Sequence, residues 1–382
     1  MLFEREDWQL FRSVETLGQK AGVSKNRLSM LVAKELVDNA LDACGTCIVG
    51  ELGSYGFFVE DDGGGIDNIE TLFSINRPLI STKLIRLPQR GALGNGLRVV
   101  TGAVLATNGK LFVSTKGKRY QLIPKYDDGS TIKQYLGEAD QLGTRIEVYL
   151  GEVTGPVNLT WAKNAIIYAK GDYYKGKTSA FWYTLEAFYE LCLASRGVSV
   201  LELVSMFDGC TGQKAGLISS DFKGKHANTL TENEARKILN NMRSLSKPVK
   251  SDRLGAIGEI NGYQYAKTMV NSGVVIPSGK SQFNAELPVV IETWVAISED
   301  EECVFSANVN RTPITGNIGI HHSKNVLQIW SCGLDTAINI GKKPIDIFFN
   351  VITPYMPITT DGKEPDFSNI NDYLSETIEK AV

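Results

Sequence analysis

An acid and an amide share one face of a predicted helix in the run KELVDNALDA, residues 34–43. Glu35 and Asn39 are four residues apart, so on a helix they project together from adjacent turns. A carboxylate beside a carboxamide is suited to activating water next to a metal-bound phosphate. Taken alone, such a pair is more typical of a solvated or capping helix face, so its interpretation depends on the segments that follow.

A second segment, GFFVEDDGGGI at residues 56–66, ends a predicted strand in acids followed by glycines. Glycine tolerates positive φ and lets a flat ligand come close to the backbone. Asp61 is then placed to accept a hydrogen bond from an exocyclic amine such as that of adenine. The alternative for this segment is a tight Asp-Gly turn without a ligand.

A third segment, RGALGNGL at residues 90–97, sets Gly91, Gly94 and Gly96 directly before a predicted helix. Successive backbone N–H groups at a helix N-terminus bind anions, and glycine lets phosphate oxygens approach them. The spacing is neither that of the P-loop nor that of the dinucleotide fingerprint. The segment is a weak signal by itself.

Two further pairs of residues would complete such a pocket. Thr82 and Lys83 precede the glycines and offer a hydroxyl and a cation to terminal phosphates. Gly143 and Thr144 open the predicted strand TRIEVYL and offer a second hydroxyl. Each piece is ambiguous alone, and the order of the pieces along the chain makes them informative.

Hydrophobic periodicity predicts the elements that would hold these side chains. Apolar residues recur at three and four from Ser24 to Cys44, which predicts a helix with Ser24 as its cap. A second helix is expected from Gly96, and strands are expected within residues 45–62 and at KLFVSTK, KRYQLIPKY and TRIEVYL. Residues 67–95 are polar without a sustained period, and a connection of that length is expected to be a functional lid.

The rest of the chain is predicted to form two further parts. Residues 178–258 are mainly helical in pattern, and after residue 259 strands return, as in PVVIETWVAI, CVFSANVN and PIDIFFNVIT. Helices beside an antiparallel or mixed sheet predict an α+β sandwich. We therefore expect an N-terminal arm and α+β domain at 1–177, a helical middle domain at 178–258 and a second α+β domain at 259–382.

Composition excludes several classes of protein. The 382 residues are 43% hydrophobic and 22% charged, as in soluble globular proteins, and no apolar run is long enough for a membrane span. The charged N-terminus MLFEREDWQL is unlike a signal peptide, so a cytoplasmic protein without membrane contact is expected. The net charge of −3 argues against nucleic-acid binding through overall charge.

Basic residues and cysteines are unevenly placed. Residues 214–253 carry nine Lys or Arg against four acids, an excess that could contact phosphates or form a solvated face. Cys44 and Cys47 form a CxxC, but no second pair follows and the chain has only three histidines. Free, structurally neutral thiols are therefore favoured over a metal site.

The order of the motifs resembles a known family. ExxxNxxDA, then DxGxG, then a lid ending in GxxGxGL, then GT resembles the ATP-binding domain of the GHKL superfamily over roughly residues 20–150. This resemblance implies an α+β sandwich of the Bergerat type that binds ATP with Mg²⁺. Sensor histidine kinases of that superfamily need a phosphoacceptor histidine upstream of the ATP-binding domain, and no histidine precedes His226 here.

The resemblance also implies roles for single residues. Glu35 would be the general base that orients or deprotonates the attacking water, and Asn39 would ligate Mg²⁺. Asp61 would read the adenine amino group, with Thr144 helping nearby. The residues expected around the nucleotide are Gly63 and Gly65 at the base, and Thr82, Lys83, Gly91, Gly94, Asn95, Gly96 and Leu97 at the phosphates.

Later segments resemble the topoisomerase VI B family. FWYTLEAFYELCLASRGVSVLELVSMFDGCTGQKAGLI resembles its helix–two-turn–helix insert, and residues 254–259 are similar to the segment that leads into its transducer domain. Residues 305–313 resemble a transducer strand and turn. Residues 353–355, followed by Gly362-Lys363-Glu364, resemble the loop that delivers a switch lysine to the ATP site, so Lys363 would contact the γ-phosphate.

These resemblances imply the Mg-dependent ATPase subunit of a type IIB DNA topoisomerase. It would close as an ATP-dependent homodimer and act on double-stranded DNA with an A-type cleaving subunit. FSNINDYLSETIEKAV could be the start of the long helix by which the family's transducer reaches that subunit. The alternatives are an ATP-gated DNA clamp or regulatory ATPase without a cleaving partner, and a scaffold that senses ATP without turnover. Glu35 disfavours the scaffold, because a base matched to water attack has a use.

Overall fold

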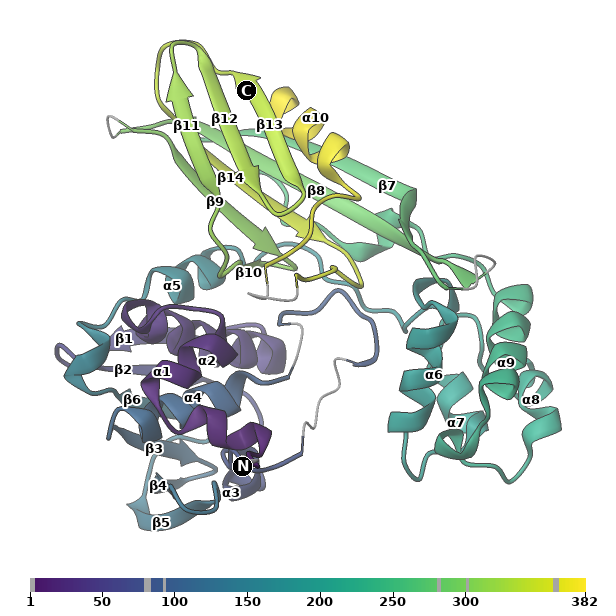
Figure 1. The fold of residues 1–382 in the computed structure, drawn as a ribbon, viewed down its shortest axis with the longest axis horizontal. Helices are drawn as coiled ribbons and strands as arrows, with labels where there is room; N and C mark the ends of the chain where they lie inside the picture. The colour runs from purple at the N-terminus through teal and green to yellow at the C-terminus, as the bar shows by residue number, and fades with distance from the viewer. Residues whose placement is uncertain (1–3, 79–83, 92–93, 280–282, 300–301, 360–363) are drawn as a thin grey trace.

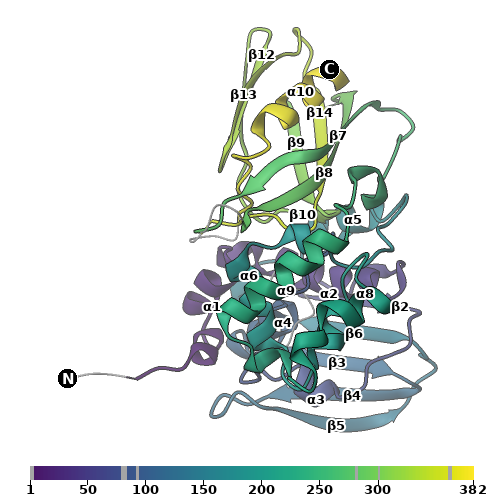
Figure 2. The same cartoon turned by 90° about the vertical axis from the view of Figure 1, so that its right-hand side faces the viewer.

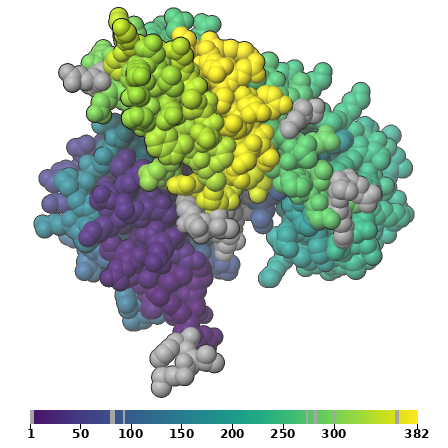
Figure 3. Space-filling model, turned by 45° about the horizontal axis from the view of Figure 1, so that its top comes forward, coloured from purple at the N-terminus to yellow at the C-terminus, as the bar shows by residue number. Residues whose placement is uncertain are grey.

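The computed structural model describes residues 4–78, 84–91, 94–279, 283–299, 302–359 and 364–382. N-terminal and middle regions lie at opposite ends of the molecule, and a C-terminal region lies across both (Figure 1 and Figure 3). The expected α+β class is confirmed. Within the described ranges, no helix combines the length and apolar character that crossing a membrane requires.

The N-terminal region consists of helices packed on an antiparallel sheet (Figure 1). Its strands lie in the order β1 (Ile48–Glu51), β2 (Gly56–Asp61), β6 (Thr144–Tyr149), β3 (Lys110–Thr115), β4 (Lys118–Pro124) and β5 (Thr131–Glu138). Its helices are α1 (Val14–Ala21), α2 (Leu28–Cys44), α3 (Ile69–Leu72), α4 (Gly96–Ala106) and α5 (Thr160–Ile167), and a 3-10 turn, Asp7–Phe11, precedes them.

Alternating side chains of the sheet explain why α2 packs against it. Phe57 and Val59 of β2 are buried, as are Ile146 and Val148 of β6, because alternate residues of a strand point to the same face. Leu36 of α2 is buried in the same core. Each such side chain contributes about 1.5–3 kcal/mol on burial. The core therefore fixes α2 while leaving its outward face available.

The middle region is helical, as its sequence predicts. It contains α6 (Leu185–Ala194), α7 (Val200–Ser205), α8 (Gln213–Ile218) and α9 (Glu232–Leu245). Thr231 begins α9 with a capping box, in which the Thr231 hydroxyl accepts from Glu234 N and the Glu234 carboxylate accepts from Thr231 N. Phe188 and Phe207 are fully buried in the core of this region.

The C-terminal region is a large mixed sheet packed against a smaller sheet and a helix. The strands lie in the order β10 (Thr312–Pro313), β9 (Val304–Val309), β14 (Ile345–Ile352), β8 (Ala285–Ile297) and β7 (Gln264–Ile276), and β9 and β14 are parallel. A small sheet of β11 (Gly319–Ser323), β12 (Val326–Ser331) and β13 (Leu334–Asn339) lies on one side with α10 (Asn371–Ala381) (Figure 2). Leu327, Leu374 and Phe349 join the two layers in one buried cluster.

One local prediction is wrong. Helix α2 begins at Leu28 after a 3-10 turn, and the Ser24 hydroxyl donates to the Asn26 side chain instead of capping the helix. The segment 67–95, whose predicted role as a lid stays a prediction, contains α3 and buries Ile69 in the N-terminal core. The apolar residues that anchor this part are too few to give a sustained period.

Candidate active site

Helix α2 presents Glu35 and Asn39 on its outward face. The opposite face is buried through Leu36, Val37 and Ala40, whereas the Glu35 side chain is 23% exposed and Asn39 is exposed. The spacing of four residues sets the two side chains on adjacent turns. A carboxylate and a carboxamide therefore lie together on an accessible helix surface.

The N-terminus of α4 lies directly against the Glu35 carboxylate. A Cβ on Gly96, the first residue of α4, would lie 2.4 Å from Glu35 Oε2, so a side chain there would collide with the acid. Among the described residues, the Asn95 side chain forms no cap on α4, so it does not occupy the first N–H groups of the helix. Gly91 and Gly94 have φ of +66° and +64°, which glycine adopts without strain.

Two other residues of the glycine segment have structural contacts. Leu97 is partly buried and packs against the N-terminal core. Asn95 Oδ1 accepts a hydrogen bond from Arg98 Nη1 at 3.3 Å. These contacts fix the first turn of α4, at the end of the helix that lies against Glu35.

Asp61 and Thr144 face each other across the neighbouring ends of β2 and β6. Asp61 Oδ1 accepts a hydrogen bond from Gly63 N at 3.0 Å, and burial raises the pKa of Asp61 above its ordinary value. Gly65 has φ of +75°, and a Cβ there would lie 2.7 Å from Thr115 Oγ1. The register of the sheet thus brings the predicted base-binding residues to one place.

Thr115 and Cys44 lie at the same place and were not predicted. Thr115 pairs with Thr144 between β3 and β6, and its hydroxyl accepts a hydrogen bond from Ile66 N at 2.9 Å. A Cβ on Gly63 would lie 3.5 Å from Cys44 Cβ. No sequence motif marks Thr115, because only strand pairing brings it beside Thr144.

The described cysteines are free thiols, as expected. Burial raises the pKa of Cys47 to about 12, so this thiol stays neutral near pH 7. The CxxC is therefore better interpreted as part of the packing between α2 and β1 than as a redox or metal site.

Helix α2 connects the two ends of the site. At its C-terminal end, Thr46 Oγ1 donates to Asp62 Oδ1 at 3.1 Å, which joins the helix to the end of β2. Glu35 precedes Cys44 by nine residues, which is roughly 13 Å along a helix axis. The surface between them can take an extended ligand with an amine-bearing ring at one end and an anionic group at the other.

A buried cluster of charges lies beneath this surface. The Lys34 ammonium contacts Glu35 Oε1 at 3.3 Å and Asp38 Oδ2 at 3.0 Å. Arg90 Nη1 lies 3.3 Å from Asp38 Oδ1, and Arg90 and Asp38 are only 3% and 4% exposed. Burial alone would lower the pKa of Lys34, but the charges of Asp38 and Glu35 outweigh burial and raise it. Lys34 therefore stays charged between the two acids.

The turn between β9 and β10 reaches this cluster from the C-terminal region. Asn310 and Arg311 have φ of +51° and +64° and form a two-residue hairpin turn. Arg90 Nη1 donates to the Arg311 carbonyl at 2.7 Å. Thr312 Oγ1 donates to Asp38 Oδ1 at 3.1 Å. Two regions of the molecule therefore share one buried set of polar contacts.

The same turn holds the start of the segment that follows β14. Thr353 N donates to Asn310 Oδ1 at 2.9 Å, and Asn310 Nδ2 donates to the Thr353 carbonyl at 3.0 Å. Arg311 N donates to Asn350 Oδ1 at 2.9 Å, and the Arg311 guanidinium lies 3.9 Å from the ring centre of Tyr173. The two late motifs identified in the sequence are thus in direct contact.

Residues 84–90 connect the candidate site to the other two regions. The Arg86 guanidinium lies 3.9 Å from the ring centre of Tyr355 and 5.2 Å from that of Tyr183. Arg86 N donates to the Tyr183 hydroxyl at 2.6 Å, and Thr178 Oγ1 donates to the Arg86 carbonyl at 2.8 Å. The second half of the predicted lid is therefore anchored outside the N-terminal region.

Thr82, Lys83 and Lys363 lie outside the described residues, and their predicted roles stay predictions. The described residues before and after Lys363 are joined, since Thr359 N donates to the Glu364 carbonyl at 2.9 Å.

Glu364 also connects this segment to the N-terminal region. Its carboxylate accepts a hydrogen bond from Asn317 N at 3.2 Å. Asn317 Oδ1 in turn accepts from Arg27 Nη1 at 2.9 Å, just before α2 begins. The described base of the segment therefore lies within two hydrogen bonds of the helix that carries Glu35.

A metal ion at Asn39 would need ligands from a bound molecule. The described part of the chain contains no group of three or more His, Cys, Asp or Glu side chains that could hold a metal. Mg²⁺ commonly takes only one or two protein ligands beside substrate phosphates and water. The exposed Asn39 amide, one helical turn from Glu35, fits Mg²⁺ that arrives with a nucleotide.

Most basic side chains in residues 214–253 are engaged within the protein. Ion pairs join Lys225 to Glu234, Arg236 to Glu232, Lys237 to Asp221 and Arg253 to Asp208. Arg243 donates to the carbonyls of Tyr183 and Asn284, and Lys214 to that of Leu245. The excess of basic residues is therefore largely a structural and solvated face, which favours that alternative over a phosphate-contacting patch.

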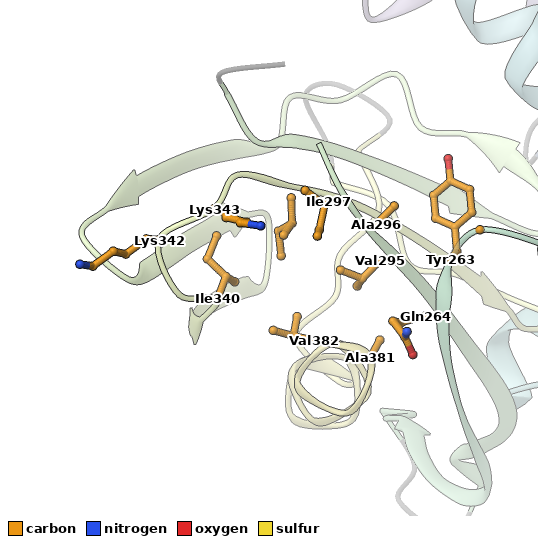
Figure 4. Close-up of a pocket in the computed structure, with 12 residues that line it drawn as sticks. Tyr263, Gln264, Val295, Ala296, Ile297, Ile340, Lys342, Lys343, Ala381 and Val382 are labelled. Atoms are coloured by element: carbon orange, nitrogen blue, oxygen red, sulfur yellow. The ribbon is translucent and has the colours of Figure 1, made fainter. Parts of the chain in front are cut away.

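A pocket of about 850 Å³ lies elsewhere, on the C-terminal region (Figure 4). Val295, Ile340 and Val382 face the space, while the Lys342 side chain points away from it (Figure 4). Its lining is mainly aliphatic, and it shares no residue with the site around Glu35. It therefore adds nothing to the nucleotide chemistry predicted from the sequence.

Comparison of the chain with models of known protein families and with curated proteins finds no match.

Proposed function

We propose that this chain binds ATP with Mg²⁺ and hydrolyses it, in the arrangement that the GHKL resemblance implies. The observation that supports this most directly is the close contact between Glu35 and Gly96 at the N-terminus of α4. Asp61 and Thr144 meet at the other end of the same helix surface. Glu35 and the N-terminus of α4 match the triphosphate end of ATP, and Asp61 at the other end matches the adenine amine.

Each group of residues has one task in this proposed reaction. Asp61 accepts the adenine amine, and the N–H groups at the start of α4 hold the phosphates. Glu35 orients the attacking water and accepts its proton. Asn39 holds Mg²⁺, which when bound neutralises phosphate charge and polarises the phosphoryl oxygen.

The broader function follows from the resemblance of the later segments. We propose an ATPase subunit of a type IIB topoisomerase, closing as a homodimer and moving double-stranded DNA with an A-type cleaving subunit. Support comes from the β9–β10 turn, where Thr312 contacts Asp38 one helical turn from Glu35. A change in the bound nucleotide would therefore alter the contacts of the C-terminal region with α2.

The second candidate is an ATP-gated clamp or regulatory ATPase without a cleaving partner. The observation that favours it is the internal pairing of most basic side chains in residues 214–253. Pull-down from the native source separates the two candidates. An A-type cleaving subunit in the captured material supports the topoisomerase, and DNA-stimulated ATPase without strand passage supports the clamp.

The hydrolysis itself is tested with Glu35→Gln. We expect nucleotide affinity close to that of the unchanged protein and turnover lowered about 10²- to 10⁴-fold, the range for loss of a general base. Glu51→Gln, at an exposed glutamate of β1, is the matched control. Normal turnover in Glu35→Gln would show that another group activates the water.

A further inference from the structure

The carboxylate of Asp38 has its two oxygens held from different sides. Oδ2 lies 3.0 Å from the Lys34 ammonium, which also contacts Glu35. Oδ1 accepts from Arg90 at 3.3 Å and from the Thr312 hydroxyl at 3.1 Å. A buried carboxylate is costly unless both of its oxygens are paired. If Oδ1 loses a donor, the remaining interaction of Asp38 with the Lys34 ammonium therefore becomes stronger.

Lys34 is therefore shared between Asp38 and Glu35. When Oδ1 of Asp38 is satisfied by Arg90 and Thr312, the ammonium can divide its contacts between the two acids. When Oδ1 loses a donor, Asp38 draws the ammonium away from Glu35. The orientation of Glu35 thus depends on a hydroxyl that comes from the C-terminal region.

The turn that delivers this hydroxyl is strained. Both central residues of this hairpin turn have positive φ, which Asn310 tolerates but which costs of order 1–3 kcal/mol at Arg311. The main chain of Arg311 is held on both of its polar groups, because its N–H donates to Asn350 Oδ1 and its carbonyl accepts from Arg90 Nη1. Such strain persists only where the surroundings over-determine it, and it is concentrated at functional sites.

We propose that Thr312 is a positioning residue for ATP hydrolysis, acting from the C-terminal region through Asp38 and Lys34 on Glu35. This inference rests on the function proposed above. The Thr312 hydroxyl contacts Asp38, and Thr312 is 8% exposed. Hydrolysis is then fastest when the β9–β10 turn is seated on α2, so the arrangement of the two regions controls the reaction.

Thr312→Val removes the hydroxyl while keeping a β-branched side chain in β10. We expect ATP affinity within twofold of the unchanged protein and kcat lowered about tenfold, equivalent to about 1.4 kcal/mol in the barrier. Thr312→Ser keeps the hydroxyl and should restore most of the turnover. A merely structural role would not separate affinity from kcat in this way.

Thr293→Val is the matched control. Thr293 lies on β8 of the same sheet, is fully buried, and its hydroxyl has no hydrogen-bond partner among the described residues. Because this hydroxyl bonds to none of the described residues of the charged cluster, its removal should leave kcat and ATP affinity unchanged. An equal fall in kcat for both valine variants would overturn the inference.

Hydrogen exchange of the nucleotide-free protein tests the contact without relying on hydrolysis. Thr312→Val should raise deuterium uptake in residues 34–42, while Thr312→Ser and Thr293→Val should not. Unchanged uptake in Thr312→Val, or normal kcat in that variant, contradicts the inference alone. Absence of hydrolysis by the unchanged protein contradicts the proposed function as well, and the two failures are thereby distinguished.

Discussion

Gly96 determines how close the N-terminal end of α4 can come to Glu35. A Cβ at this position would lie 2.4 Å from Glu35 Oε2, far inside normal contact distance. The position has ordinary helical geometry, so glycine is needed here for space and not for a special φ. The same atom-to-atom approach would bring a bound terminal phosphate next to the acid.

Gly96→Ala should therefore displace Glu35 while preserving the fold. We expect kcat to fall about a hundredfold, because a shift of about 1 Å in a reacting group has an effect of that size. Circular dichroism and thermal unfolding should stay near those of the unchanged protein. Gly216→Ala is the control, since a Cβ at Gly216 in α8 would meet nothing within 4 Å. Full turnover in Gly96→Ala would remove Glu35 from the proposed reaction.

The exposed half of the candidate site could be predicted from the sequence, and the buried half could not. Glu35 and Asn39 share a helix face because of their spacing alone, and Asp61 is followed by glycines that mark a close approach. Asp38 and Arg90 have no such mark. Their importance depends on burial and on contacts across long stretches of chain, which local periodicity does not encode.

At the scale of elements, the segment 84–90 belongs by packing to regions other than its own. Ile85 and Leu87 pack against the cluster formed by the middle and C-terminal regions. Arg86 is held between Tyr183 and Tyr355, which come from those two regions. Residues 84–90 therefore connect the start of the glycine segment, residues 90–97, to the middle and C-terminal regions.

Arg86→Ala should weaken the docking of residues 84–90 on the middle and C-terminal regions. Each cation–π contact is worth about 0.5–2 kcal/mol, so the docked segment should lose roughly 1–3 kcal/mol of local stability. We expect faster hydrogen exchange in residues 84–91 and a several-fold fall in ATP turnover. Arg119→Ala removes a comparable stack on Phe112, far from the joint, and should change neither quantity. Equal exchange in both variants would mean that Arg86 does not hold the segment.

Helices and strands with a clear hydrophobic pattern were predicted, whereas an exposed edge strand was missed. Helix α4 begins at Gly96 as expected, and β8 matches its continuous apolar run because both of its faces are covered. Strand β5 was missed, since it lies at the edge of its sheet with Ile132, Tyr135 and Leu136 exposed. Its apolar residues do not alternate toward a core, so the usual strand signal is absent.

At the scale of the whole molecule, two further joints help to fix the C-terminal region. Tyr168, after α5, stacks on Phe348 of β14 with ring centres 3.7 Å apart. Glu292 of β8 is fully buried and accepts hydrogen bonds from Ile257 N at 2.9 Å and Gly258 N at 2.8 Å. One joint is aromatic and the other polar, and together they hold the sheet to the regions on either side.

Assembly should depend on the nucleotide if the proposed closure is correct. We expect sedimentation to show dimers with ATP and Mg²⁺, and monomers after a chelator removes the metal, because the phosphates would lose a ligand that neutralises them. Glu35→Gln should keep the dimer longer, since it retains ATP. An identical sedimentation profile with and without nucleotide would argue against ATP-driven dimer closure.

The docking of residues 84–90 also bears on how such a protein can be divided. A cut after residue 177 would separate the N-terminal region from the middle and C-terminal regions. It would leave Ile85 and Leu87 without the surface that covers them. The middle region would lose the partner of Tyr183 at the same time. A gene fusion that kept the N-terminal region without the middle region, or the reverse, would therefore expose apolar surface on the part that is kept. Recombination could exchange the three regions together, or a middle region together with a matching segment 84–90, without exposing this apolar surface.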